Sequence, residues 1–261
     1  MKKIKAYISG FFEYRPLLME LVKRSIKVRY RHSVLGMLWT VLNPLLNMVV
    51  LTIVFSHMFR MDIDNFPLYV LIGNIVFSFN SEASTQGMIS IVSNASLIKK
   101  VYIPKYLFPL SYALSCLVNV GFSLIAMLVV MLFTKAPFHI TLITIWIPMV
   151  YLFLFSFGLS MILCSANVFF RDMQHLYGVL TAVWMYFSAI FYSVEIMPME
   201  LRGAIETNPM YRYISFFRQV IMEGTFPGIE ENLICLAWSI GMLITGLVVF
   251  YKAQNKFILH I

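Results

Sequence analysis

Long runs without Lys, Arg, Asp or Glu constrain the fold of this chain more than any other feature. They cover residues 33–59, 106–134, 136–170, 173–194 and 232–250, and a further run over 65–98 is interrupted only by Glu82. Roughly 20 apolar residues suffice for a helix to cross the hydrocarbon core of a bilayer. With 60% hydrophobic and 12% charged residues, the chain is predicted to be a polytopic membrane protein.

Six membrane-spanning helices fit these runs. None of the runs shows the alternation of a transmembrane barrel strand, and an open sheet edge would leave backbone groups unpaired in lipid. We therefore predict an all-α polytopic membrane protein with a single transmembrane domain over 1–261. Residues 33–194 hold spans one to five, and 232–261 hold the sixth span and a tail. No cleavable signal is expected, so residues 1–32 should stay attached.

Lysine and arginine are unevenly placed along the chain. Most of the 20 lie before residue 33, within 99–105, at Arg171 and beyond residue 250, whereas the other side of the predicted membrane receives few. The positive-inside rule then places both termini and residues 94–105 in the cytoplasm. Because topology accounts for most of the net charge of +8, no nucleic-acid partner is expected.

The segment after Pro16 has the pattern of an amphipathic helix. Basic residues recur on one face, and the other face carries Leu18, Leu21, Val22 and Val28. We expect this helix to lie at the membrane interface with its apolar side in the acyl boundary. The residues nearest the first span either anchor the topology or meet an anionic lipid head group: Arg29, Arg31 and His32.

A polar, dibasic island over 94–105 separates the second and third predicted spans. It cannot stay in hydrocarbon, yet it carries enough apolar side chains to dock on another protein. We predict a short helix at the membrane face that receives a partner. The candidate contact residues are Leu97, Ile98, Lys99, Lys100, Val101, Tyr102, Ile103 and Pro104.

Residues 195–231 differ from the rest, with three prolines and mixed charge. Two short helices are expected on the extracytoplasmic side, the second beginning at Pro209. They are predicted to be re-entrant, and a plain surface loop is the alternative.

Cysteine and histidine offer no metal-binding pattern. The three cysteines fall inside predicted spans, and the five histidines are scattered without the spacing of metal ligands, so no metal site is predicted. No catalytic residues are predicted either, because the acidic residues after the fifth span form no recognisable constellation: Glu195, Glu200, Glu206, Glu230 and Glu231. A membrane-embedded transferase is therefore the weakest alternative.

Four segments in order resemble the membrane subunit of ABC-type polysaccharide exporters, which carry O-antigen, capsule or teichoic acid. They are Tyr30–Pro44, Leu97–Lys105, Asn167–Asp172, and Met197-Pro-Met followed by Asn208-Pro209 and Arg218. The resemblance implies a homodimer in the bacterial cytoplasmic membrane that pairs with two copies of a separate ATPase. It also implies an undecaprenyl-diphosphate-linked glycan as substrate, and residues 97–104 as the coupling helix.

The chain has no Gly-x-x-x-x-Gly-Lys-Ser/Thr loop. ATP and Mg are therefore expected to be bound by the partner subunit, with no cofactor on this chain and no enzymatic activity of its own.

Aromatic residues in the first and fifth spans have two interpretations. They form an interface belt, or they line a conduit on which sugar rings slide: Trp39, Trp184, Tyr186, Phe187, Phe191 and Tyr192. A charged carboxylate such as Glu82 costs free energy inside a membrane span unless it is paired or hydrated. We therefore favour a Glu82 side chain that packs against the dimer mate or faces the conduit. The remaining alternatives are a proton-coupled secondary transporter and an ABC exporter of a small lipophilic molecule.

Overall fold

The computed structural model describes residues 14–31, 33–59 and 63–261, so His32 and Arg60 lie outside the described residues. All regular structure in these ranges is helical, which confirms the predicted all-α class. Among the described residues, four helical stretches are long and apolar enough to cross a membrane: Gly36–Val54, Leu107–Phe133, Ile140–Phe169 and Ile229–His260.

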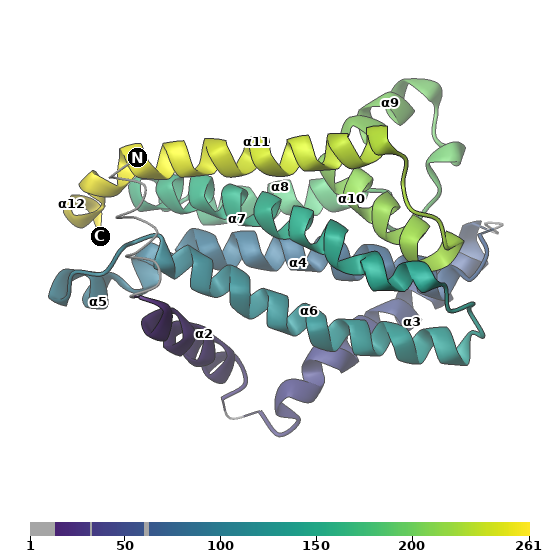
Figure 1. Ribbon diagram of the computed structural model, residues 1–261, viewed down its shortest axis with the longest axis horizontal. Helices are drawn as coiled ribbons and strands as arrows, with labels where there is room; N and C mark the ends of the chain where they lie inside the picture. Colours follow the sequence, from purple (N-terminus) through teal and green to yellow (C-terminus); the bar gives the residue numbers. More distant parts are fainter. Residues whose placement is uncertain (1–13, 32, 60–62) are drawn as a thin grey trace.

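Four long helices run side by side and form the body of the molecule (Figure 1): α4 (Phe66–Ser93), α6 (Leu107–Phe133), α7 (Trp146–Phe169) and α11 (Ile229–Ala253). Helix α7 packs along both α11 and α4, and α6 packs on α4. Helix α3 (Trp39–Phe59) crosses α4 and α6 obliquely, and α8 (Met173–Tyr186) packs on α4 and α7.

The two ends of this bundle carry different short helices. One end holds α2 (Arg15–Arg29), α5 (Ala95–Lys100), α12 (Phe257–His260) and the C-terminus, and the other holds α9 (Met199–Thr207) and α10 (Pro209–Arg218) (Figure 1). The remaining elements are the 3-10 turns η1 (Gly36–Leu38), η2 (Ile140–Ile145), η3 (Val194–Ile196) and η5 (Gln254–Lys256), and the π-helical turn η4 (Gln219–Glu223).

Two of the six predicted spans differ from the other four. Helix α8 ends at Tyr186 after 14 residues, although the predicted span continued to residue 194. At 1.5 Å per residue it covers about 21 Å, less than the roughly 30 Å of a hydrocarbon core. Helix α4 has 28 residues, and its polar side chains keep it out of the four apolar stretches.

Glycine permits the close approach of α7 and α11. A Cβ added at Gly158 would lie 2.5 Å from the carbonyl carbon and oxygen of Met242, and one added at Gly246 would collide with the Gly158 carbonyl. Small residues let two membrane helices pack backbone against backbone. The crossing therefore depends on glycine at both positions.

Helix α2 corrects one expectation from the sequence. Leu18, Leu21 and Val22 are buried inside the protein, and Leu18 and Leu21 join an apolar cluster with residues of α4, α5 and α6. The prediction that this face lies in the acyl boundary is wrong for these three residues, because α6 and its neighbours already cover them. Val28, on the same predicted face, remains exposed.

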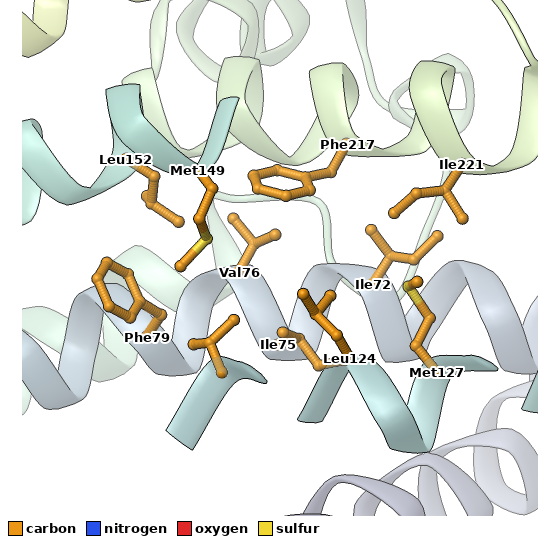
Figure 2. Close-up of a pocket in the computed structure, with 11 residues that line it drawn as sticks. Ile72, Ile75, Val76, Phe79, Leu124, Met127, Met149, Leu152, Phe217 and Ile221 are labelled. Carbon is orange, nitrogen blue, oxygen red and sulfur yellow. The ribbon is translucent and has the colours of Figure 1, made fainter. Parts of the chain in front are cut away.

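The interior between α4, α6, α7 and α10 is apolar and tightly filled. Figure 2 shows side chains from these helices and η4 around a void of only about 10 Å³, with Ile72 and Val76 facing Phe217 and Ile221. A void of this size holds one water at most, and its walls offer no polar group. It is core and not a ligand site.

Asn208 and Arg218 fix the two short helices at the far end. The Asn208 side chain accepts a hydrogen bond from the Met210 backbone N–H, which confirms the predicted helix start at Pro209. The buried Arg218 guanidinium donates to the carbonyls of Ala189 and Ile190 at 3.1–3.2 Å and lies 3.3 Å from the Tyr69 ring centroid. Arg218 thus ties α10 to the turn after α8.

Candidate functional site

A polar cleft opens between α3, α4 and α6, next to the apolar core, with which it shares Ile75, Phe79 and Val120. Its volume is about 390 Å³, and we call it the α3 cleft. Its lining residues are Arg29, Tyr30, Trp39, Thr40, Asn43, Pro44, Asn47, Asn74, Ile75, Ser78, Phe79, Glu82, Asn119, Val120 and Ser123. Amides, hydroxyls and one carboxylate thus converge in a bundle that is otherwise strongly apolar.

Helical spacing brings these polar groups together. Asn74, Ser78 and Glu82 follow one another at intervals of four on α4, so they share one helix face. Asn43 and Asn47 do the same on α3, as do Asn119 and Ser123 on α6. Three polar stripes from three helices therefore face one space. Within α4, Ser78 donates to the Asn74 side chain at 3.3 Å, and Ser123 of α6 donates both to the Asn119 carbonyl at 3.2 Å and across to the Thr40 carbonyl of α3 at 3.3 Å.

An ion pair joins α2 to the α3 cleft. The Arg29 guanidinium contacts the Glu82 carboxylate, with side chains 23% and 36% exposed. Next to the pair, the Tyr30 hydroxyl approaches the Asn119 side-chain oxygen at 3.5 Å. Burial opposes the charge on Arg29, but the Glu82 carboxylate and its neighbours outweigh burial and raise the pKa of Arg29. Glu82 therefore has a partner within its own chain.

A second cleft, also lined by Arg29, lies between α2, α4 and α6. Its volume is about 260 Å³, and we call it the α2 cleft. Its lining residues are Leu21, Arg24, Ser25, Val28, Arg29, Gln86, Ser93, Asn94, Phe108, Ser111 and Tyr112. Among the residues that the structure describes, Arg29 is the one that lines both clefts. Arg31 is exposed and lines neither of them.

The predicted docking segment is split between the core and the surface. Helix α5 ends at Lys100, and the chain then continues in extended form. Val101 and Tyr102 are 53% and 89% exposed, whereas Ile98 and Ile103 are each only 7% exposed. Ile98 and Ile103 cannot fill a groove on a partner, because they pack in the chain's own apolar cluster. Lys99 and Lys100 are exposed, and Leu97 and Pro104 are partly buried.

The C-terminal tail holds this segment in place. The Lys105 ammonium donates to the Gln254 carbonyl at 2.7 Å and lies 5.9 Å from the ring centroid of Phe257, which is fully buried. Partial burial lowers the pKa of Lys105. The exposed tip at Val101 and Tyr102 is therefore held between a buried Ile98 and a Lys105 that is bound to the C-terminal tail.

The six predicted conduit aromatics do not gather in one place within the chain. Trp39 lines the α3 cleft, whereas the other five lie at the end of α8 and in the turn after it. Trp184 packs edge-on to Phe77 and Phe155. Of the remaining four, Phe191 is buried, Tyr192 is partly buried, and Tyr186 and Phe187 are exposed.

Comparison with known proteins identifies the family. The family model described as "ABC-2 type transporter" matches residues 16–222. The chain belongs to this family. It is 31% identical to the O-antigen export system permease protein RfbA of Myxococcus xanthus, over 96% of this chain and 97% of that protein. It is 29% identical to a Klebsiella pneumoniae protein of the same name over 98% and 97%, and 23% identical to the polysialic acid transport protein KpsM of Escherichia coli over 95% and 97%.

In this ABC-2 type transporter chain, sequence reasoning found Arg29 and Trp39 but missed the cleft that holds them. The available signal was the spacing of four between polar residues on α3, α4 and α6. The partner of Glu82 carried no such signal, since Arg29 lies on a different helix.

Proposed function

We propose that the chain is the membrane subunit of an ATP-driven exporter that moves an undecaprenyl-diphosphate-linked polysaccharide across the bacterial cytoplasmic membrane. Family membership and the names of its relatives support the transport class and the polysaccharide. The single observation that carries the proposal is the α3 cleft, in which amides, hydroxyls, Trp39 and a charged pair meet inside an apolar bundle.

The chemistry of the α3 cleft suits a carbohydrate. Side-chain amides such as those of Asn43, Asn47 and Asn74 can donate and accept, so each can serve a sugar hydroxyl in either role. Trp39 offers an aromatic face on which a sugar ring can stack, at the start of α3. The cleft would hold the sugars nearest the lipid, while Arg29 and Arg31 meet the diphosphate, because the arginine fork makes paired bonds to phosphate.

Two alternatives fit less well. A pocket for a small lipophilic molecule should be a largely apolar cavity of about 300–1,000 Å³, but the apolar void of Figure 2 measures only about 10 Å³. A proton-coupled carrier would need Glu82 as its proton site. That carboxylate is already paired with Arg29.

The proposal includes an assembly of two copies of this chain with two ATP-binding subunits. The proposal takes α4 and α8 as the second and fifth of six crossings, so that both termini and α5 would lie in the cytoplasm, in agreement with the positive-inside rule. Tyr102 and Val101, exposed beside Lys99 and Lys100, would then dock on the ATPase, which binds ATP and Mg. Helices α9 and α10 would be re-entrant on the outer side, and the conduit would run along α3 and α8 of the dimer.

The test is a deletion of the gene in its source bacterium, followed by complementation. Loss of surface polysaccharide together with accumulation of lipid-linked glycan in the cell, restored by the intact gene, is the expected result. The Arg29→Gln, Arg31→Gln double variant should restore less export and less substrate-stimulated ATP hydrolysis, while a Lys135→Gln control should restore both. Unchanged surface glycan after deletion would refute the proposal.

A further inference from the structure

We propose that the Arg29–Glu82 ion pair is an exchangeable gate between the two clefts, opened when a phosphate-type anion displaces Glu82 from Arg29. This inference rests on the proposed function, because it takes Arg29 as the site of the anionic head group. In this inference Glu82 competes with the ligand for Arg29, in addition to being neutralised by Arg29 as a partly buried acid.

The position of the pair carries the first step. Arg29 is shared by the linings of the α2 cleft and the α3 cleft, while Glu82 lines only the α3 cleft. The contact between them therefore lies where the two clefts meet. A head group that enters the α2 cleft reaches Arg29 on the wall that the two clefts share, and it must break the contact with Glu82 before attached sugars can reach the amides.

The charges on the two sides carry the second step. Within the described part of the chain, the charged residues that line the α2 cleft are Arg24 and Arg29, and none of the lining residues is acidic. An anion there meets two cations. A diphosphate offers more negative charge and more acceptor oxygens than one carboxylate, and arginine binds phosphate through two parallel hydrogen bonds. The exchange therefore favours the phosphate.

The rest of α2 is held independently of the pair. Leu18 and Leu21 are buried in the apolar cluster, and the Ser25 and Ser115 hydroxyls lie 3.1 Å apart. Arg29 is the last residue of α2, and Gly36 with φ of +50° follows before α3. Opening of the pair can thus move the C-terminal end of α2 without releasing the helix.

The experiment measures the Kd of the full-length chain in detergent micelles by native mass spectrometry. Two probes are titrated separately, undecaprenyl diphosphate and inorganic pyrophosphate. The variants are Glu82→Gln, Arg29→Gln and the combination of both. Glu20→Gln is the matched control, since Glu20 is an exposed acid of α2 that forms an ion pair with Lys23 at the surface.

Exchange predicts opposite effects of the two single variants. Glu82→Gln should tighten binding about fivefold, which corresponds to about 1 kcal/mol. Arg29→Gln should weaken binding about tenfold or more, and the double variant should match Arg29→Gln, because Glu82 competes only through Arg29. Glu20→Gln should leave the Kd unchanged. Tightening with both probes identifies phosphate as sufficient, and tightening with the lipid alone identifies the lipid head group as the ligand; either pattern supports the exchange.

Other outcomes separate the two ideas. Weakened or unchanged binding in Glu82→Gln, with weakened binding in Arg29→Gln, overturns the exchange and leaves the anion site standing. Unchanged binding in Arg29→Gln overturns the anion site itself. If Glu82→Gln does not fold, Glu82→Asp keeps the charge but shortens the side chain, and it should tighten binding about twofold; the absence of any tightening would then refute the gate.

Discussion

Replacement of Tyr102 by Asp should separate partner binding from folding. Tyr102 is 89% exposed at the tip of the segment after α5, and its base is fixed by Ile98 and Ile103, each 7% exposed. A surface substitution of this kind usually changes the free energy of unfolding by no more than about 0.5 kcal/mol. The Tm of Tyr102→Asp should therefore stay within about 2 °C of the wild-type value.

The effect on the ATPase should be far larger. Truncation of an aromatic anchor in the centre of an interface typically reduces the binding free energy by at least about 2 kcal/mol, which weakens binding by roughly 30-fold. A carboxylate in its place adds the cost of desolvating a charge. Affinity can be measured by biolayer interferometry between the chain in nanodiscs and the purified ATPase, with transport measured in parallel.

Ile98→Asp is the matched comparison for Tyr102→Asp. It places a charge in the chain's own apolar cluster, so it should lower the Tm strongly and reduce membrane expression. Wild-type affinity and wild-type export in Tyr102→Asp would refute the docking role of this tip. Equal losses of Tm in both variants would refute the division of the segment into base and tip.

Two further substitutions test the packing. Gly158→Ala should lower the free energy of unfolding by about 1–3 kcal/mol, or the Tm by roughly 2–12 °C, because the added Cβ would lie 2.5 Å from the Met242 carbonyl. Gly241→Ala on α11 is the control and should be neutral or stabilising, because a Cβ there has nothing within 4 Å. Equal Tm values for the two variants would contradict the close crossing. Trp184→Phe should cost about 0.5–1.5 kcal/mol, because it removes the 2.8 Å hydrogen bond to the Asn208 side chain; loss of export with an unchanged Tm would instead indicate a conduit contact.

The helical class and most helix positions could be predicted from the sequence because hydropathy and charge act locally along the chain. Residues 106–134 became α6 with both ends close to those predicted, whereas α7 ends near residue 170 as predicted but begins only at Trp146, after η2. Helix α8, where the fifth span was predicted, is shorter than predicted because the chain turns at Ala189, whose φ is +48° and whose carbonyl accepts from Arg218. That turn depends on a residue 29 positions away, which no local pattern reports.

The sequence also could not show whether protein or lipid covers the apolar face of a short helix. Leu18 and Ile98 both lie in amphipathic segments, and amphipathic periodicity shows that a face is apolar without showing what covers it. In this chain the cover is protein, supplied by α6 and its neighbours. The result changes the expected role of α2 from a helix embedded in lipid to a wall of the α2 cleft.

Arg218 and Arg29 both hold a partly or fully buried positive charge, but with different kinds of partner. Arg218 donates to the backbone carbonyls of Ala189 and Ile190, and these carbonyls cannot move away without unfolding the turn after α8. Arg29 is held by the carboxylate of Glu82, a side chain that rotates, and both are partly exposed to clefts. A charge fixed by backbone suits a permanent joint, whereas a charge fixed by a mobile acid suits a site whose ligand comes and goes. The difference in partners is therefore the strongest structural reason to look for exchange at Arg29 and for rigidity at Arg218.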